Sequence, residues 1–220
     1  MTVLRRERPD LLALQELRGW DRRHRERMRT VADATGMVPH LARSVFGQPV
    51  AVLVRPPLRI VRRRSFAWRM HHAAAAVRLS NGLTFVSAHL NPWSGERRRR
   101  EAVWLSSLFP GEVIIAGDMN SLDPYTDHSA ALAGIDARRH LLPSGEVDTR
   151  AIASFRHAGF SDWWCLSGVG EGRTVPTSIG GAEFGPMRLD YILARSSLVP
   201  RDVRVLCDEA SDHYPVRADL

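Results

Sequence analysis

Apolar residues occur in short runs that alternate with charged stretches, a pattern typical of buried strands separated by helices and loops. The pair Asn81-Gly82 between two such runs is a strong signal for a hairpin turn. We therefore expect an antiparallel middle of the chain. Strands are predicted at residues 11–15, 50–54, 58–61, 73–79, 83–90, 113–116, 188–194, 202–206 and 214–218.

Three segments have helical patterns, at residues 20–34, 95–109 and 148–158. In the second, Ala102, Leu105 and Phe109 share one face and arginines occupy the opposite one. Hairpins mixed with helices predict an α/β fold, an α+β sandwich in which two packed mixed β-sheets are flanked by helices. No long polar linker divides the 220 residues, so we expect a single domain, 1–220.

The composition, 44% hydrophobic and 25% charged, can supply a sizeable core. No apolar stretch is long enough to cross a bilayer, and the first residues lack the pattern of a secretory signal. We expect a cytoplasmic monomer with no transmembrane segment. Cys165 and Cys207 lie far apart, with neither a CxxC spacing nor a histidine at zinc-ligand distance, so neither a metal knot nor a disulfide framework is indicated.

The 31 basic residues are all arginine and outnumber 24 acidic residues, for a net charge of +7. A basic chain favours polyanionic partners, although a GC-rich genome also produces arginine without lysine. The run Arg97 to Arg100 is predicted to be the solvated face of a helix, with i,i+4 pairs such as Glu96 with Arg100. A polyanion-binding patch is the alternative for this run. The run Arg62 to Arg64, with Phe66 and Trp68, has the pattern of basic residues mixed with aromatic ones, but a strand that alternates outward arginines with inward apolar residues gives the same pattern.

Candidate chemistry lies at the ends of the predicted strands. Glu16 follows the first, Asp118 and Asn120 follow the run 113–116, and Asp190 and His213 lie in the last third of the chain. Carboxylates and a carboxamide without paired thiols select a hard cation such as Mg²⁺ or Mn²⁺. These residue types suit hydrolysis of a phosphate ester, which needs charge neutralisation and an activated water. Taken singly, each has an ordinary structural interpretation as a turn former, a surface carboxylate or a packed histidine.

Five segments in sequence resemble the endonuclease/exonuclease/phosphatase superfamily. They are Pro9 to Glu16, Val86 to Leu90, Gly117 to Ser121, Arg188 to Ile192 and Ser211 to Val216. The resemblance implies a DNase-I-like four-layer sandwich. Members usually begin with a strand that ends in Asn, whereas this chain begins in the following helix. The first strand is therefore expected to be missing, through a start assigned too far downstream or a truncation.

The resemblance also implies catalytic roles. Asp118 would position the attacking water, and Asn120 would support the same phosphate. His213 would contact the scissile phosphate with Asp190 as its carboxylate partner, and His89 would line the phosphate pocket. No role is expected for His71 or His72. The remaining histidines are expected at the surface, namely His24, His40, His128, His140 and His157.

For the metal, the resemblance implies that Glu16 is a ligand and that Asp212 lies at or beside the ion, Mg²⁺ or Mn²⁺. The expected function is hydrolysis of a phosphodiester by direct attack of an activated water. A nuclease acting on DNA or RNA is slightly favoured by the net charge. The alternatives are a phosphatase or phosphodiesterase for a small metabolite or lipid head group, and a non-catalytic domain that binds phosphate ligands.

Overall fold

The computed structural model describes residues 1–220 and consists of two compact units. Unit 1 comprises Met1–Leu90 and Gly111–Gly117, and unit 2 comprises Asn91–Pro110 and Asp118–Leu220. Both units therefore contain segments that are distant in the sequence. No helix is both long and apolar enough to cross a bilayer.

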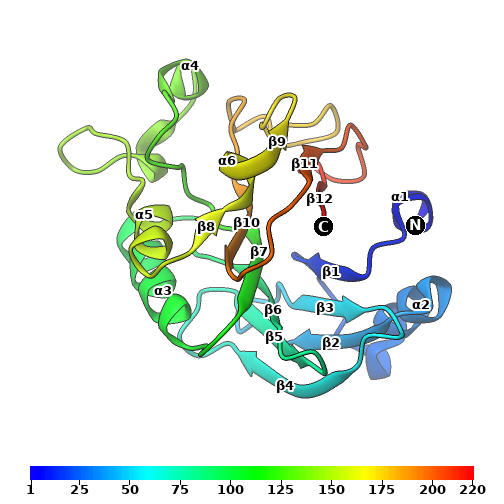
Figure 1. The fold of residues 1–220 in the computed structure, drawn as a ribbon. Helices are drawn as coiled ribbons and strands as arrows, with labels where there is room; N and C mark the ends of the chain where they lie inside the picture. The colour runs from blue at the N-terminus through cyan, green and yellow to red at the C-terminus, as the bar shows by residue number, and fades with distance from the viewer. The chain divides into compact units, whose positions relative to one another are not determined.

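Unit 1 begins with a short helix and is otherwise built mainly from strands (Figure 1). Its elements are α1 (Thr2–Glu7), β1 (Leu11–Leu14), η1 (Arg23–Arg25), α2 (Glu26–Thr35), β2 (Val38–Ala42), β3 (Val50–Val54), β4 (Ile60–Phe66), β5 (Ala73–Leu79), β6 (Thr84–His89) and β7 (Val113–Asp118), whose last residue belongs to unit 2. Helix α2 ends at Gly36, whose φ of 65° is left-handed and is the backbone conformation that glycine adopts without steric cost.

Two layers of strands pack face to face in unit 1. One is the antiparallel sheet β1-β3-β2, in which Leu12 lies opposite Leu53 and Leu41 opposite Ala51. The other contains β4, β5, β6 and β7 in that order, with β4 at the edge. Strand β3 contacts both β5 and β6, and every residue of β3 is buried. A fully apolar strand such as Val50–Val54 is stable here because both of its faces are covered.

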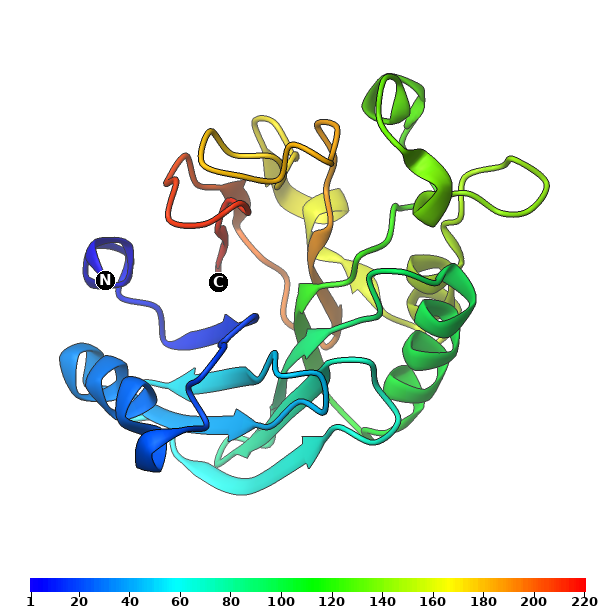
Figure 2. The same ribbon diagram turned by 180° about the vertical axis from the view of Figure 1, so that it is seen from behind.

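Unit 2 contains the remaining helices and strands. They are α3 (Gly95–Ser107), α4 (Ser129–Leu132), η2 (Ala137–His140), α5 (Arg150–His157), β8 (Ser161–Asp162), α6 (Trp163–Ser167), β9 (Gly168–Val169), β10 (Asp190–Arg195), β11 (Asp202–Val205) and β12 (Val216–Asp219). Helices α3 and α5 lie side by side in both views (Figure 2). The strands pair as β10 with β8 and as β12-β11-β9, and α6 contacts β10 and β11.

The expected combination of packed mixed sheets and flanking helices is confirmed, but several local predictions were wrong. Strand β2 was missed, because its sequence Val38-Pro39-His40-Leu41-Ala42 carries a proline and a histidine. Helix α2 begins at Glu26 rather than near residue 20, since Arg23, His24 and Arg25 all have positive φ and interrupt the helix.

Predictions about the arginine runs were confirmed in part. Glu96 does pair with Arg100, at 2.9 Å, but Arg98 is buried and donates to the carbonyl oxygens of Asn91 and Arg139. In β4, the alternation of outward and inward residues, one of the two interpretations of the run Arg62 to Arg64, is not observed, because Val61, Arg62, Arg63, Arg64 and Ser65 are all exposed. An edge strand allows this, since one side of it has no neighbouring strand.

The surface assignment was wrong for two histidines. His128 and His140 are buried in unit 2. His128 Nε2 lies 2.8 Å from the carbonyl oxygen of Asp123, and burial together with the charges of Arg98 and Arg139 lowers the pKa of His140 to about 3. His140 is therefore neutral at physiological pH.

Candidate active site

The first part of the candidate site is the turn that ends β7. Asp118 accepts two hydrogen bonds from Asn120: its Oδ1 from the backbone N–H at 2.8 Å, and its Oδ2 from the side-chain Nδ2 at 3.1 Å. Asn120 has a φ of 48°, a left-handed conformation that asparagine tolerates better than most residues. Both side chains are buried. The turn thus fixes the Asp118 carboxylate and the Asn120 carboxamide relative to each other.

This turn is fastened to the start of β10. The N–H of Met119 donates to the carbonyl oxygen of Leu189 at 2.8 Å, and both residues are fully buried. Leu189 immediately precedes Asp190. One backbone hydrogen bond therefore joins the segment of Asp118 and Asn120 to the segment of Asp190, although about 70 residues separate them.

Asp190 holds His213. The Nδ1 of His213 lies 2.7 Å from Asp190 Oδ2, a short distance typical of a charge-assisted hydrogen bond. Burial alone would lower the pKa of His213, but the charge and hydrogen bond of Asp190, with the charges of Asp118 and Asp212, raise it to about 10. His213 is therefore an imidazolium at neutral pH, and its Nε2–H is a donor in addition to the Nδ1–H that Asp190 accepts.

Thr174 connects the Asp190 and His213 segments, and no sequence pattern indicates this role. Its hydroxyl oxygen accepts from the N–H of Leu189 at 3.0 Å and from the N–H of Asp190 at 3.2 Å. Its carbonyl oxygen accepts from the N–H of Tyr214 at 2.8 Å. Thr174 is fully buried. One residue therefore sets the backbone positions on both sides of the carboxylate and imidazolium pair.

The loop that carries His213 is held at further points. Ser211 Oγ accepts from the N–H of His213 at 3.0 Å, and Thr177 Oγ1 donates to the carbonyl oxygen of Ser211 at 2.7 Å. The Phe184 ring meets His213 edge to face, with centroids 6.0 Å apart. Asp212, by contrast, forms no hydrogen bond or ion pair through its carboxylate. That carboxylate remains available to a ligand.

A second set of contacts, also missed at the sequence level, supports the same segments in unit 2. The guanidinium of Arg188 donates to Asp162 at 2.8 Å and to Asp123 at 3.1 Å. The hydroxyl of Tyr191 donates to the carbonyl oxygen of Ser121 at 2.9 Å. Arg188 and Asp190 lie two residues apart but have different partners, because Asp190 bonds to His213. Arg188 thus holds the segment before Asp190 against the segments of Asp123 and Asp162.

In unit 1, three strand ends meet. Gln15 Nε2 donates to Ser87 Oγ at 2.9 Å, and Ser87 Oγ donates to the carbonyl oxygen of Leu14 at 3.1 Å. Gly117 packs so closely that a Cβ there would lie 2.1 Å from the carbonyl oxygen of Ala88 and 2.8 Å from Gln15 Nε2. A side chain at position 117 would therefore clash. In the sequence, Glu16 follows Gln15, His89 follows Ala88 and Asp118 follows Gly117.

Glu16 and His89 have different environments within unit 1. Glu16 is exposed, has a left-handed φ of 54°, and forms no hydrogen bond or ion pair through its carboxylate. His89 is buried, and its ring stacks on that of His72 with centroids 4.0 Å apart. His72, to which no role was assigned, is buried as well. A packed His89 ring agrees with both a structural and a phosphate-lining role.

The residues expected at the metal fit a magnesium-type ion in their donor chemistry. The structure contains no cluster of three or more histidine, cysteine, aspartate or glutamate side chains with ligating geometry. Mg²⁺, however, is usually bound through one or two carboxylates and completes its shell with waters and substrate phosphate. Neither Glu16 nor Asp212 forms a hydrogen bond or an ion pair through its carboxylate. An unpaired acid at a fixed backbone position is what such an ion requires.

Comparisons with known proteins cover nearly the whole chain. A structure of an endonuclease/exonuclease/phosphatase family protein from Leptotrichia buccalis is similar at 16% identity and a TM-score of 0.66, covering 99% of this chain and 90% of that one. A mannosyl-6-phosphatase from Bacteroides thetaiotaomicron matches at 16% identity and a TM-score of 0.68, covering 99% and 87%. No curated protein sequence matches.

A humanized TDP2 from D. rerio is similar at 17% identity and a TM-score of 0.68, covering 99% of this chain and 87% of that one. At such identities the likeness shows the fold. The sequence profile of the Endonuclease/Exonuclease/phosphatase family matches residues 1–213. Because that match spans almost all of the chain, the protein belongs to the endonuclease/exonuclease/phosphatase family, whose members are phosphoesterases that generally use a divalent metal.

Proposed function

We propose that the protein is a divalent-metal-dependent phosphoesterase that hydrolyses a phosphodiester by direct attack of water. The observation that carries the proposal is the hydrogen bond of 2.7 Å between Asp190 and His213. The segment of Asp190 is in turn joined to the Asp118 turn by the backbone hydrogen bond from Met119 to Leu189. An anionic phosphate needs a fixed cationic donor, and the imidazolium of His213 supplies one.

The roles of the residues follow from their bonding. Asp190 orients the His213 ring and keeps it protonated, so that its Nε2–H can donate to a non-bridging oxygen of the phosphate. Asp118, held by Asn120, orients the attacking water and accepts its proton as the water oxygen bonds to phosphorus. The bond from phosphorus to the leaving oxygen then breaks. No residue of the chain is covalently modified.

Glu16 and Asp212 are the proposed holders of the cation, because neither carboxylate forms a hydrogen bond or an ion pair within the protein. When bound, the ion would neutralise phosphate charge and stabilise the leaving oxygen. His89 is proposed to line the phosphate pocket through the side of its ring that does not stack on His72.

The test compares substrates and metal conditions. Purified protein is incubated with bis(p-nitrophenyl) phosphate, with p-nitrophenyl phosphate and with plasmid DNA, each in MgCl₂, in MnCl₂ and in excess EDTA. We expect hydrolysis of the diester in Mg²⁺ or Mn²⁺ and none in EDTA. Hydrolysis unchanged by EDTA, or no hydrolysis of any ester with either metal, would refute the proposal, and phosphate binding without turnover would favour a non-catalytic domain.

A second candidate is a phosphatase for a small phosphomonoester. It is favoured by the likeness to a mannosyl-6-phosphatase, at a TM-score of 0.68. Release of inorganic phosphate from sugar phosphates, together with an intact plasmid, would establish it in place of the diesterase. The same site residues would serve both reactions, because they contact the phosphate rather than the leaving group.

A further inference from the structure

The positive charge of the chain is concentrated in one segment. Residues 34–90 contain eight arginines and no aspartate or glutamate. Removing these eight from the 31 basic residues leaves 23 arginines against the 24 acidic residues elsewhere. The rest of the chain is therefore almost neutral, and the whole excess of +7 arises from this segment. The eight arginines are Arg43, Arg55, Arg59, Arg62, Arg63, Arg64, Arg69 and Arg78.

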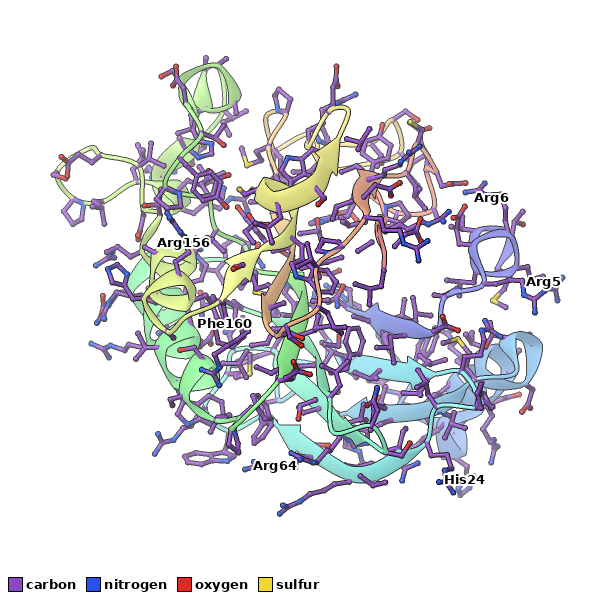
Figure 3. The ribbon with its side chains drawn as sticks, viewed as in Figure 1. Arg5, Arg6, His24, Arg64, Arg156 and Phe160 are labelled. Carbon is purple, nitrogen blue, oxygen red and sulfur yellow. The ribbon has the colours of Figure 1, made fainter.

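The segment lies entirely in unit 1, where it forms β2 to β6. Three of the arginines follow one another in β4, the edge strand, and all three are exposed. Figure 3 labels Arg64, which extends from β4 away from the ribbon. In the register of β4 and β5, Arg62 lies directly opposite Arg78, which is also exposed. Like charges facing each other across a strand pair destabilise the sheet unless an anion intervenes.

These charges are not neutralised by the protein. Arg62, Arg63, Arg64 and Arg78 form no ion pair with an acidic side chain. The second arginine run behaves differently, since Arg99 and Arg100 both pair with Glu96 at 2.9 Å. Arginines of this chain thus form ion pairs where an acidic side chain is nearby. The arginines of β4 form no such pair and can bind an anion from outside the chain.

Exposed aromatic rings border the same strand. Trp68, two residues after the end of β4, is 74% exposed, and the guanidinium of Arg69 lies over its ring at 4.6 Å. Phe46, in the loop after β2, is 61% exposed and stacks on His71 with centroids 4.3 Å apart. The contact between Phe46 and His71 joins the loop after β2 to the loop between β4 and β5. Charges on an edge strand also prevent aggregation, but that function does not require exposed aromatic side chains.

We propose that this edge of unit 1 binds single-stranded nucleic acid. The basic aromatic surface is defined by Arg62, Arg63, Arg64, Arg78, Trp68 and Phe46. The arginines would contact backbone phosphates, and the rings would stack on unpaired bases, which a duplex does not offer. The surface goes beyond the proposed hydrolysis, because its binding requires neither turnover nor a metal.

The test measures binding without catalysis. Fluorescence anisotropy of a labelled single-stranded oligonucleotide, of its duplex and of the matching RNA strand is recorded in EDTA over a series of salt concentrations. The variants are R62Q/R63Q/R64Q and Trp68→Ala. The matched control is R99Q/R100Q/R138Q, which removes three charges from arginines that pair with Glu96 or Asp136, of which Arg100 and Arg138 are exposed and Arg99 is half-buried. Liposomes with and without phosphatidylserine report binding to anionic lipid, and circular dichroism checks the fold of each variant.

We expect the β4 triple variant to reduce the slope of log K against log salt by about 2, because each phosphate contact contributes about 0.7 for a single strand. Trp68→Ala should weaken single-strand binding about tenfold and leave duplex binding nearly unchanged. The proposal is overturned if the control triple loses as much affinity as the β4 triple, if the duplex binds as tightly as the single strand, or if only anionic liposomes bind. The binding measurement in EDTA does not depend on hydrolysis. If the protein fails to hydrolyse any ester, the proposed function fails but the binding result still stands.

Discussion

Replacing Thr174 with valine tests how the site is positioned. Valine keeps the shape of threonine but removes the hydroxyl oxygen that accepts from the N–H groups of Leu189 and Asp190. Leu189 is fully buried and Asp190 is partly buried, so neither N–H gains easy access to water. A buried donor without an acceptor costs about 1–3 kcal/mol. Because Asp190 is only partly buried, its N–H is placed at the low end of that range, and the two donors together predict a loss of roughly 2–4 kcal/mol in the free energy of unfolding.

The assay combines stability, amide exchange and kinetics. For a protein of this size the loss corresponds to a decrease in Tm of about 5–12 °C. Amide hydrogen exchange of Leu189 and Asp190 should accelerate, while that of Tyr214 should not, because it bonds to the Thr174 carbonyl oxygen, which the variant retains. We expect kcat to fall about tenfold or more with little change in KM, since Asp190 is displaced rather than removed. Thr174→Ser restores the hydroxyl and should recover kcat.

Two results would refute this reasoning. One is a valine variant with the exchange rates and kcat of the unmodified protein. The other is a serine variant as impaired as the valine variant, which would attribute the effect to packing of the methyl group. Thr84→Val is the matched control, because Thr84 is also buried but lies in β6 of unit 1.

Three further predictions address the charges. The folded pKa of His213, about 10, exceeds the unfolded value near 6.5. The stabilisation that its pairing with Asp190 gives the fold is therefore complete below pH 6.5 and is lost as the pH rises through 10. Denaturant titrations should show this decline, and Asp190→Asn should greatly reduce it, because only the weaker effects of the Asp118 and Asp212 charges remain. A flat profile in the unmodified protein would contradict the pairing. Glu16→Gln should raise the Mg²⁺ concentration needed for half-maximal hydrolysis about tenfold or more with unchanged Tm, and an unchanged requirement would remove Glu16 from the metal. Arg188→Met should lower the free energy of unfolding by about 3–5 kcal/mol, because Asp123 and Asp162 lose their buried counter-ion; a variant as stable as the unmodified protein would show that the pairs contribute little.

Strand patterns and strand-end acids were the predictable part of this protein. Apolar runs such as Val50–Val54 and Val113 to Ala116 are buried strands in the structure, because only strands buried on both faces are so uniformly apolar. The turn after β7 and the pairing of Asp190 with His213 also agree with expectation. The catalytic and metal roles of the seven candidate residues stay predictions.

The unpredicted features depend on contacts between distant segments. Thr174 is one threonine in a loop-rich stretch, and the hydrogen bonds that it accepts from residues 189, 190 and 214 exist only because these residues come together in the fold. His128 and His140 are buried by packing that leaves no periodic signal in the sequence. Strand β2 was missed because Pro39 and His40 disfavour a strand by local propensity, whereas pairing with β3 stabilises it.

The most direct test of the central claim measures kcat/KM for metal-dependent diester hydrolysis in Asp118→Ala and His213→Ala. The matched controls are Asp127→Ala and His157→Ala, which alter exposed residues of unit 2. We predict that each site variant loses about 10²–10⁴-fold in kcat/KM while remaining folded, and that the controls keep the rate of the unmodified protein. Site variants that hydrolyse the diester as fast as the controls would contradict the account.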